Sequence, residues 1–251
     1  MKFTKMHGTG NDYIYINGFE EKLENPSEAA VKLSDRRFGI GSDADLDFAI
    51  RRGRLPHGDV QRGRFHRKMC GNGIRCVAKY VYDRGLVKKD VLRVETRSGV
   101  KTLQLRVEDG KVASVRVNMG QPELDPEKSR SCFQRTAWWT KRCILPLETC
   151  GGSPVFRWAT ARGDFVDDVE GVNLPAIGPE MEKHAMFPER ANIEFAQVSG
   201  PHEVQMRVWE RGSGETLACG TGACACAVAS VLTGKTDRDV TVHLRGGDLH
   251  I

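Results

Sequence analysis

The chain has 251 residues, of which 39% are hydrophobic and 28% charged, with a formal net charge of +5 at pH 7. This length and composition allow a substantial buried core, and no apolar run is long enough to cross a bilayer. Residues 1–8 lack the apolar core of a signal peptide, so we expect a cytoplasmic protein whose eight cysteines are reduced thiols.

The N-terminal half alternates between strand-like and helical patterns. Taken in chain order, these patterns predict strands at 2–6 and 13–16, a helix at 26–38, a helix that follows Cys70 and ends near Gly85, and strands at 92–96, 100–107 and 112–117. Glycine-containing turns at 7–12, 98–99 and 109–110 separate the strands. From Ala44 to Lys68 neither period is present.

Most of the excess positive charge lies in that patternless segment, where Arg51 to Lys68 is almost without acids. On charge alone this run could be a nucleic-acid patch. One aromatic residue, Phe65, accompanies it and no nucleic-acid module surrounds it. We therefore expect no nucleic-acid partner.

The C-terminal half loses its pattern from about Glu123 to Gly163 and recovers it at 165–169. The elements predicted after that point are a helix at 175–184, strands around 192–195 and at 204–209, a helix after Cys219, and a strand at 240–244. The strand at 204–209 alternates cleanly and leads directly into Glu210 and Arg211.

A Cys-Gly-polar-Gly turn occurs once in each half, as Cys70-Gly71-Asn72-Gly73 and as Cys219-Gly220-Thr221-Gly222. Each runs into an apolar, alanine-rich helix. A thiol at a helix N-terminus lies against the positive end of the helix dipole, which lowers its pKa and makes it a usable base or nucleophile. A single such cysteine is more often a small core residue, but the matched pair favours a function for both.

The other cysteines of these helices are expected to be packing residues: Cys76, Cys224 and Cys226. Zinc is the alternative use of many cysteines. The spacing of Cys224 and Cys226 does not fit a C-x-x-C knuckle, and no His/Cys pair completes a four-ligand set, so we expect no metal.

Two such thiols, one from each of two related domains, are suited to inverting a carbon that bears a C–H bond. The inversion needs a base on one face and an acid on the other, and a thiolate with a thiol supplies both. Backbone N–H groups of Gly71-Asn72 and of Gly220-Thr221 are expected to hold a carboxylate and to stabilise the enolate-like charge of the reaction. No cofactor motif is present, and this chemistry needs none.

These motifs resemble those of the diaminopimelate epimerase family, whose members interconvert LL- and meso-diaminopimelate without a cofactor on the way to lysine and peptidoglycan. Five segments carry the resemblance: His7–Asp12, Met69–Cys76, Glu189–Phe195, Glu210–Thr216 and Ala218–Gly222. The resemblance implies an α+β fold of two pseudo-symmetric domains, each a mostly antiparallel sheet wrapped around a central helix. We divide them as 1–118 and 119–251, each with one catalytic cysteine, and expect a homodimer.

For the site, the resemblance implies that Cys70 and Cys219 are the acid–base pair, with backbone donors from the two cysteine turns. It further implies that four side chains contact the substrate: Asn11, Asn192, Glu210 and Arg211. Arg211 would bind a carboxylate, a bidentate role that suits arginine. Without the resemblance, Asn11 reads as an Asx turn and Glu210-Arg211 as a solvated pair, although the strand that delivers this pair beside the second cysteine turn favours the site.

Two segments depart from the family pattern where the periodicity fails. The family carries Phe-Asn-Ala-Asp-Gly-Ser before Met69 and Val-Ser-Met-Gly-Asn-Pro-His in mid-chain, whereas residues 60–65 here read Val-Gln-Arg-Gly-Arg-Phe and residues 155–160 read Val-Phe-Arg-Trp-Ala-Thr. Codons for 60–66 read one base later, and codons for 155–160 read two bases later, permit the first six and the first five residues of these motifs. We hypothesise that much of 44–68 and part of 123–163 are frameshift products, and we expect the family's strands beyond Ile251 to be missing.

Two alternatives remain open at this stage. Proline racemase-like and hydroxyproline epimerase-like enzymes of the same structural family also use two cysteines. Glu210-Arg211 and the Gly-Asn-Asp turn at 10–12 favour diaminopimelate, because a substrate with two amino-acid ends needs extra polar contacts at its distal end. The second alternative, of a different class, is a catalytically impaired remnant that binds a ligand or a partner.

Overall fold

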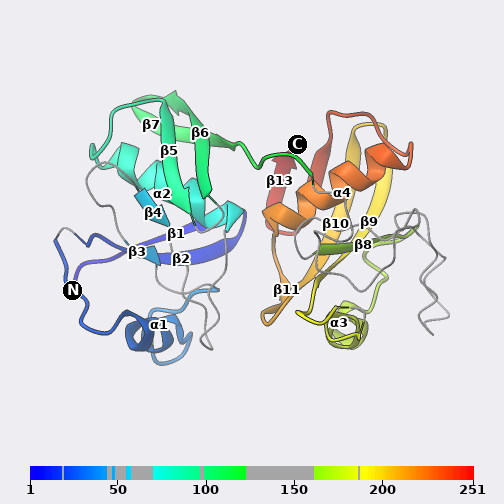
Figure 1. Ribbon diagram of the computed structural model, residues 1–251, viewed down its shortest axis with the longest axis horizontal. Coiled ribbons are helices and arrows are strands. Elements are labelled where there is room, and N and C mark those ends of the chain that lie inside the picture. Colours follow the sequence, from blue (N-terminus) through cyan, green and yellow to red (C-terminus); the bar gives the residue numbers. More distant parts are fainter. Residues whose placement is uncertain are drawn as a thin grey trace. The chain divides into compact units, whose positions relative to one another are not determined.

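The structure is a computed structural model, and it describes residues 1–18, 20–43, 47–48, 55–57, 70–96, 99–122, 161–185 and 187–251 (Figure 1). The chain divides into two compact units, Met1–Gly120 and Gln121–Ile251, called here the first and the second unit. Each unit contains a 13-residue helix whose N-cap residue is a cysteine. Of the two patternless segments, only residues 47–48, 55–57 and 161–163 are among the described residues.

The first unit is built from the elements β1 (Thr4–Gly8), β2 (Asn11–Ile16), α1 (Pro26–Ser34), β3 (Asp47–Phe48), β4 (Leu55–His57), α2 (Gly71–Asp83), β5 (Val91–Thr96), β6 (Gly99–Glu108) and β7 (Lys111–Val117). Its described strands form one sheet in the order β1-β2-β3 and another in the order β4-β5-β6-β7. Short strands β3 and β4 pair in parallel with β2 and β5, and the other pairs are antiparallel.

Helix α2 lies between these two sheets because it has apolar residues on more than one face. Ile74, Ala78 and Val81, spaced at helical intervals, pack against β5, β6 and β7. Cys70 and Cys76 pack instead against tyrosines of β2. Burial of each large aliphatic side chain in such a core stabilises the fold by about 1.5–3 kcal/mol. The packing therefore fixes the start of α2 against both sheets.

Helix α1 and the turn between β1 and β2 are both shorter than the sequence predicts. Helix α1 stops at Ser34 rather than at Phe38, because Asp35 leaves the helical conformation and its carboxylate accepts the backbone N–H groups of Arg37 and Phe38, 2.8 Å away in each case. The turn between β1 and β2 consists of Thr9 and Gly10 alone, both with positive φ (53° and 86°), as in a type I′ hairpin.

The second unit is built from β8 (Ala161–Phe165), α3 (Leu174–Glu182), β9 (Asn192–Gly200), β10 (Glu203–Glu210), β11 (Gly214–Thr216), α4 (Gly220–Leu232), β12 (Thr241–Leu244) and β13 (Gly247–His250). The described strands form one sheet in the order β13-β12-β10-β9-β8, with β11 paired to β10. Strand β8 comes before the pattern at 165–169 that was expected to mark it, and β13 was not predicted. The local pattern of β13 is weak, and the strand is formed through its antiparallel pairing with β12.

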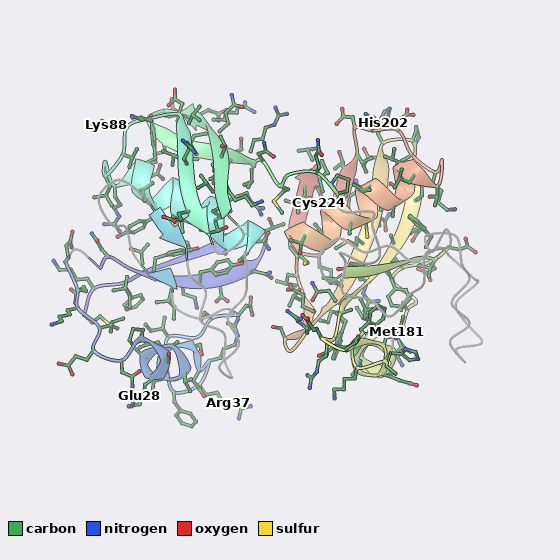
Figure 2. All side chains as sticks on the ribbon, viewed as in Figure 1. Glu28, Arg37, Lys88, Met181, His202 and Cys224 are labelled. Carbon is green, nitrogen blue, oxygen red and sulfur yellow. The ribbon has the colours of Figure 1, made fainter. Side chains whose placement is uncertain are left out.

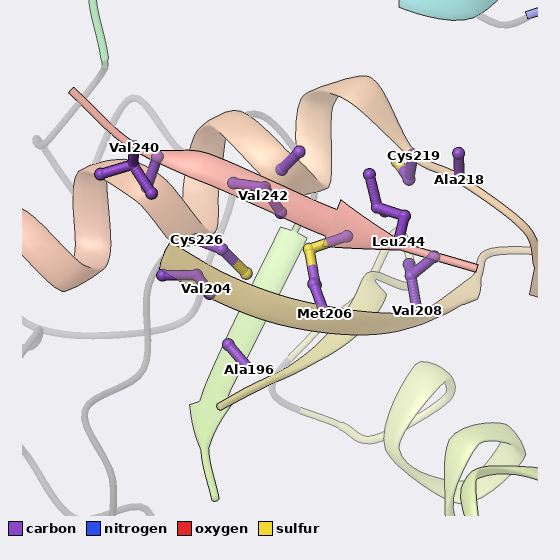
Figure 3. Packing of buried hydrophobic residues seen from close by; sticks show 12 residues of the cluster. Ala196, Val204, Met206, Val208, Ala218, Cys219, Cys226, Val240, Val242 and Leu244 are labelled. Atoms are coloured by element: carbon purple, nitrogen blue, oxygen red, sulfur yellow. The ribbon is translucent and has the colours of Figure 1, made fainter. Parts of the chain in front are cut away.

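Helices α4 and α3 pack on opposite faces of this sheet. Alternate residues of β10, among them Val204 and Met206, point toward Cys226 and Ala227 of α4, whereas Ile193 and Phe195 of β9 pack with α3. Met181 of α3 and Cys224 of α4, both buried, are labelled in Figure 2. Figure 3 shows the α4 cluster, in which Cys219 stands at the end nearest the loop from β11. The sheet thus holds the start of α4 in place.

Both units are sheets packed around a cysteine-capped helix, which confirms the expected α+β class. The three helix-interior cysteines expected to pack are all buried: Cys76, Cys224 and Cys226. None of the described helices is long and apolar enough to span a membrane.

Candidate active site

Both candidate catalytic thiols cap the helix that follows them. Cys70 has extended backbone angles (φ −116°, ψ 112°), and its Sγ accepts the N–H of Gly73 at 3.3 Å. Cys219 repeats this arrangement (φ −131°, ψ 107°), and its Sγ accepts the N–H of Gly222 at 3.4 Å. A side-chain acceptor at the N-cap satisfies one of the helix's unpaired N–H groups, and the same N–H stabilises a thiolate. Both thiols are buried, at 8% and 6% exposure.

Tyrosines of β2 make further contacts to the first cysteine turn. The hydroxyl of Tyr13 lies 3.0 Å from Cys70 Sγ, and the hydroxyl of Tyr15 donates to the carbonyl of Gly73 at 3.0 Å. The sequence analysis missed both residues. The alternation of β2 was the available signal, because it places Tyr13 and Tyr15 on one face of the strand.

The β1–β2 hairpin approaches the first cysteine turn closely at Gly8. A Cβ atom on Gly8 would lie 2.8 Å from the backbone carbonyl oxygen of Asn72, so this contact requires glycine. Asn11, the cross-strand partner of Gly8, is buried beside it. The structure therefore brings three predicted site positions of the first unit together with Cys70, namely Asn11, Gly71 and Asn72.

Arg75 connects the two parts of this cluster, although no sequence pattern singled it out. Its guanidinium donates to the side-chain oxygen of Asn72 at 2.9 Å and to the hydroxyl of Thr9 in the hairpin turn at 2.7 Å. It also donates to the carbonyl of Gly71 at 3.2 Å. The amide oxygen of Asn72 is thus directed to Arg75, and the expected role of Asn72 as a backbone donor stays a prediction.

In the second unit, Asn192 links the second thiol to Arg211. Its amide nitrogen lies 3.7 Å from Cys219 Sγ, and its amide oxygen accepts the backbone N–H of Arg211 at 2.9 Å. The hydroxyl of Thr221 lies 3.3 Å from the same sulfur. Strand β9 begins at Asn192 and strand β10 ends at Glu210, and these two strands are antiparallel neighbours, so the sheet itself gathers these residues.

Glu210 and Arg211 differ in their surroundings. Glu210 is buried and accepts a hydrogen bond from the hydroxyl of Thr216 at 2.7 Å. Arg211 is half-buried, and its guanidinium donates to the carbonyl of Glu189 at 2.7 Å. The burial of Glu210 fits a role in the site better than the alternative of a solvated surface pair, because a surface carboxylate would be exposed.

Glu182 of α3 anchors the loop that carries these two residues, and the sequence analysis missed it. Its buried carboxylate accepts the indole N–H of Trp209 at 3.0 Å and the backbone N–H of Gly212 at 3.2 Å. A third donor is the guanidinium of Arg190 at 3.3 Å. A carboxylate with this many donors holds the loop rigidly.

The net shift in the pKa of the second thiol is opposite to the lowering expected from the helix N-terminus. Burial raises the pKa of Cys219 well above its ordinary value, and the carboxylates of Glu210 and Glu194 raise it further, while hydrogen bonds from Thr221 and Gly222 lower it only in part. Desolvation penalises the charged form and like charges add to that penalty, so they outweigh the dipole. Cys219 is consequently a thiol at neutral pH.

Glu194 is a further neighbour of Cys219 that the sequence analysis did not identify. It is fully buried on the α4 face of the sheet, and a Cβ atom on Gly222 would lie 2.5 Å from its Oε1. Glycine at position 222 thus admits a carboxylate directly beneath the helix N-terminus. Its signal in the sequence was a lone charged residue within the apolar alternation of β9.

Comparison with solved structures defines the class of fold to which these units belong. A probable proline racemase from Agrobacterium radiobacter has a TM-score of 0.64 at 13% identity, over 99% of this chain and 83% of that one. A phenazine biosynthesis protein of the PhzF family from Bacillus anthracis has a TM-score of 0.65 at 14% identity, over 100% of this chain and 90% of that one. The protein therefore has the fold of the racemase and PhzF-type proteins.

The sequence comparisons assign the family within that class. A family model described as diaminopimelate epimerase matches residues 3–124 and 164–251. Diaminopimelate epimerases from Desulfovibrio desulfuricans and Acetivibrio thermocellus are 46% and 48% identical, over 100% of this chain and 90% of each relative. The chain belongs to the diaminopimelate epimerase family, as its motifs predict. Residues 125–163 fall outside the family match, whereas the patternless segment 44–68 falls inside it.

Proposed function

We propose that this protein is an isomerase that epimerises LL-diaminopimelate to meso-diaminopimelate by two-base proton transfer at the α-carbon. The observation that carries the proposal is that each unit places a buried cysteine at the N-cap of a 13-residue helix, with a glycine N–H on its sulfur. Membership of the diaminopimelate epimerase family supports the choice of substrate.

The reaction moves one proton onto a sulfur and another off a sulfur. A thiolate takes the α-proton, so that an S–H bond forms and the C–H electron pair passes into the carboxylate as an enolate-like charge. The opposite thiol then gives its proton to the other face, so that a C–H bond forms and that sulfur becomes a thiolate. This route requires a sulfur at each face of the same α-carbon, and the two roles swap with the direction of the reaction.

The environment of Cys219 supports one choice of starting roles. Because burial and the carboxylates of Glu210 and Glu194 raise the pKa of Cys219, this residue enters the reaction as the thiol. We accordingly propose Cys70 as the base that removes the α-proton of the LL substrate. The reverse reaction, from meso to LL, uses the opposite assignment, in which Cys219 is the thiolate that removes the proton.

The substrate's reacting carboxylate binds to the start of the two helices. The first N–H groups of an α-helix have no acceptor within the helix, and those of Gly71, Asn72, Gly220 and Thr221 occupy these positions. Asn11, Asn192, Glu210 and Arg211 bind the polar groups of the substrate, with the Arg211 guanidinium on a carboxylate. The reaction uses no cofactor and no metal.

Further proposals concern the cellular context. The protein acts in the cytoplasm as a homodimer on a small amino-acid substrate, without a nucleic-acid or membrane partner. Sedimentation equilibrium at micromolar concentration tests the dimer, and a monomer at all concentrations would contradict it.

The activity is tested by deuterium entry at the α-carbon of diaminopimelate in deuterated water under reducing conditions. We expect exchange in the unchanged protein and its loss, by about 10³-fold or more, in Cys70→Ala and Cys219→Ala. Matched controls are Cys76→Ala and Cys224→Ala in the same two helices, which should keep the exchange. A folded protein without exchange would contradict the proposal and favour the impaired remnant.

A further inference from the structure

Tyr13 contacts the sulfur of Cys70, a candidate catalytic atom, and the proposed reaction gives Tyr13 no role. It lies in β2, is only 1% exposed, and its hydroxyl is 3.0 Å from Cys70 Sγ. Either atom of this pair can be the hydrogen-bond donor. The contact connects a strand to the thiol across 57 residues of sequence.

We propose that Tyr13 is a positioning residue for Cys70, whose hydroxyl donates a hydrogen bond to the Cys70 thiolate and accepts one from the Cys70 thiol. The sulfur is thereby held in one place in both of its protonation states. The catalytic consequence rests on the proposed function, whereas the effect on the thiol itself is measurable without substrate.

The chemistry of a hydroxyl suits this position better than that of an amide. The N–H of Gly73 also donates to Cys70 Sγ; it can stabilise the thiolate but cannot accept a hydrogen from the thiol. A phenol does both and remains neutral near pH 7, because its ordinary pKa is about 10. A two-base mechanism alternates Cys70 between the two states, so it needs a partner for each.

The surroundings of Tyr13 leave its hydroxyl little freedom. Its ring contacts that of Tyr15 with centroids 6.1 Å apart, and Tyr15 in turn stacks on Tyr80 of α2 at 6.2 Å. Tyr15 is also hydrogen-bonded to the carbonyl of Gly73 in the same turn. A preorganised donor loses little conformational entropy when charge forms on the sulfur.

The second unit supplies the same chemistry to its thiol from a different element. There the hydroxyl of Thr221, two residues after Cys219, lies 3.3 Å from the sulfur and can donate or accept. The equivalent position after Cys70 is Asn72, whose side-chain oxygen accepts from Arg75. In the first unit the hydroxyl therefore comes from strand β2.

The test is the pH dependence of Cys70 alkylation by iodoacetamide, followed by peptide mass spectrometry, in Tyr13→Phe. Loss of the donor to the thiolate should raise the apparent pKa of Cys70, with a reactivity at pH 7 about tenfold lower. The matched control is Tyr15→Phe. It removes another buried hydroxyl of β2, one that donates to the Gly73 carbonyl of the same cysteine turn rather than contacting the Cys70 sulfur. This control should leave the Cys70 profile unchanged.

An unchanged Cys70 profile in Tyr13→Phe would overturn the inference, and so would an equal shift in Tyr15→Phe, which would indicate general loosening of the turn. Deuterium exchange into diaminopimelate separates this inference from the proposed function. If the unchanged protein shows exchange, Tyr13→Phe should lower kcat about tenfold with KM little changed. A shifted profile in a protein without any exchange supports the hydrogen bond and contradicts the epimerase activity alone.

Discussion

At the residue scale, the neighbours of Cys219 shift the pKa of its thiol in opposite directions. The N–H of Gly222 and the hydroxyl of Thr221 favour the thiolate, whereas burial and the carboxylates of Glu210 and Glu194 favour the thiol and prevail. The contacts of Cys70 include a phenol hydroxyl, from Tyr13, and the N–H of Gly73. Two thiols with the same local motif thus have different side chains among their contacts, and such differences are what set acid and base apart in the proposed reaction.

Replacing Glu194 by Gln should lower the pKa of Cys219. The change removes one like charge next to the sulfur while keeping the shape of the side chain. We expect alkylation of Cys219 to become faster at pH 7 to 8, measured by peptide mass spectrometry. The control Glu203→Gln removes a carboxylate that is remote from the thiol in the same sheet.

Alkylation of Cys219 at an unaltered rate in folded Glu194→Gln would contradict the assigned effect of this carboxylate. The direction is opposite to that expected for Cys70 in Tyr13→Phe. The two variants together therefore distinguish a change in local charge from a general loss of packing, which would accelerate alkylation in both.

At the element scale, the β1–β2 hairpin is held against the first cysteine turn by a backbone contact. Replacing Gly8 by Ala would place a Cβ atom 2.8 Å from the Asn72 carbonyl oxygen, and backbone atoms cannot move aside cheaply. We expect a loss of about 1–3 kcal/mol in the free energy of unfolding, measured by urea denaturation, together with reduced exchange activity.

The matched control is Gly200→Ala at the end of β9, where the nearest atom to the new Cβ is 4.0 Å away. This variant should change stability by less than about 1 kcal/mol. Equal effects of the two substitutions on the free energy of unfolding would contradict a destabilisation caused by the close approach of Gly8 to Asn72.

The same hairpin is also held near its turn by an ion cluster around Asp12. Burial raises the pKa of Asp12, but hydrogen bonds from Arg36 and Lys5 and from the backbone of Asp43 outweigh it and lower that pKa to about 2. Arg36 also pairs with Asp43. A carboxylate with a lowered pKa stabilises the fold above its unfolded pKa of about 3.9, and this contribution is lost as the pH falls toward 2.

The stability difference between the unchanged protein and Asp12→Asn should therefore be present at pH 6 and shrink from about pH 4 downward. Its size should stay within about 1 kcal/mol, since the paired cations are partly exposed to solvent. Urea denaturation at several pH values measures it. If Arg36→Gln left the effect of Asp12→Asn undiminished, the pairing would not be its cause.

At the scale of the whole molecule, each unit has its own apolar core. One core is formed between α2 and strands β5 to β7, and the other between α4 and strands β10 and β12. Both cores lie in parts of the chain with regular patterning, and both fall within the family match. The fold is therefore built from the segments whose local preference agrees with it, as expected of a foldable sequence.

Resequencing of the gene is expected to find compensating shifts of reading frame around the codons of 44–68 and of 123–163. Restoring the frames should add the two missing asparagine-containing motifs and raise the deuterium exchange at least tenfold, because substrate contacts that position the reacting carbon would return. An unbroken frame that encodes the residues as written would contradict this hypothesis.

The site could be predicted in part because caps and turns are local. The Cys-Gly-polar-Gly pattern specifies an N-cap thiol from a few adjacent residues, and the structure has this cap at Cys70 and Cys219. The meander over β5 to β7 was likewise predicted, since alternation and turn residues are local signals. By contrast, α1 ended early at Asp35, where a side chain competed with the helix for backbone donors.

The sequence by itself determined the family, the α+β class and the two capped helices, because local periodicity and short motifs encode each of them. Only the tertiary structure decided which side chains surround each sulfur. Tyr13 reaches Cys70 from a distant strand, and Glu194 lies beneath Gly222 only because β9 passes under α4. The protonation of Cys219 depends on burial and on charges brought together by folding, and no local pattern records either quantity.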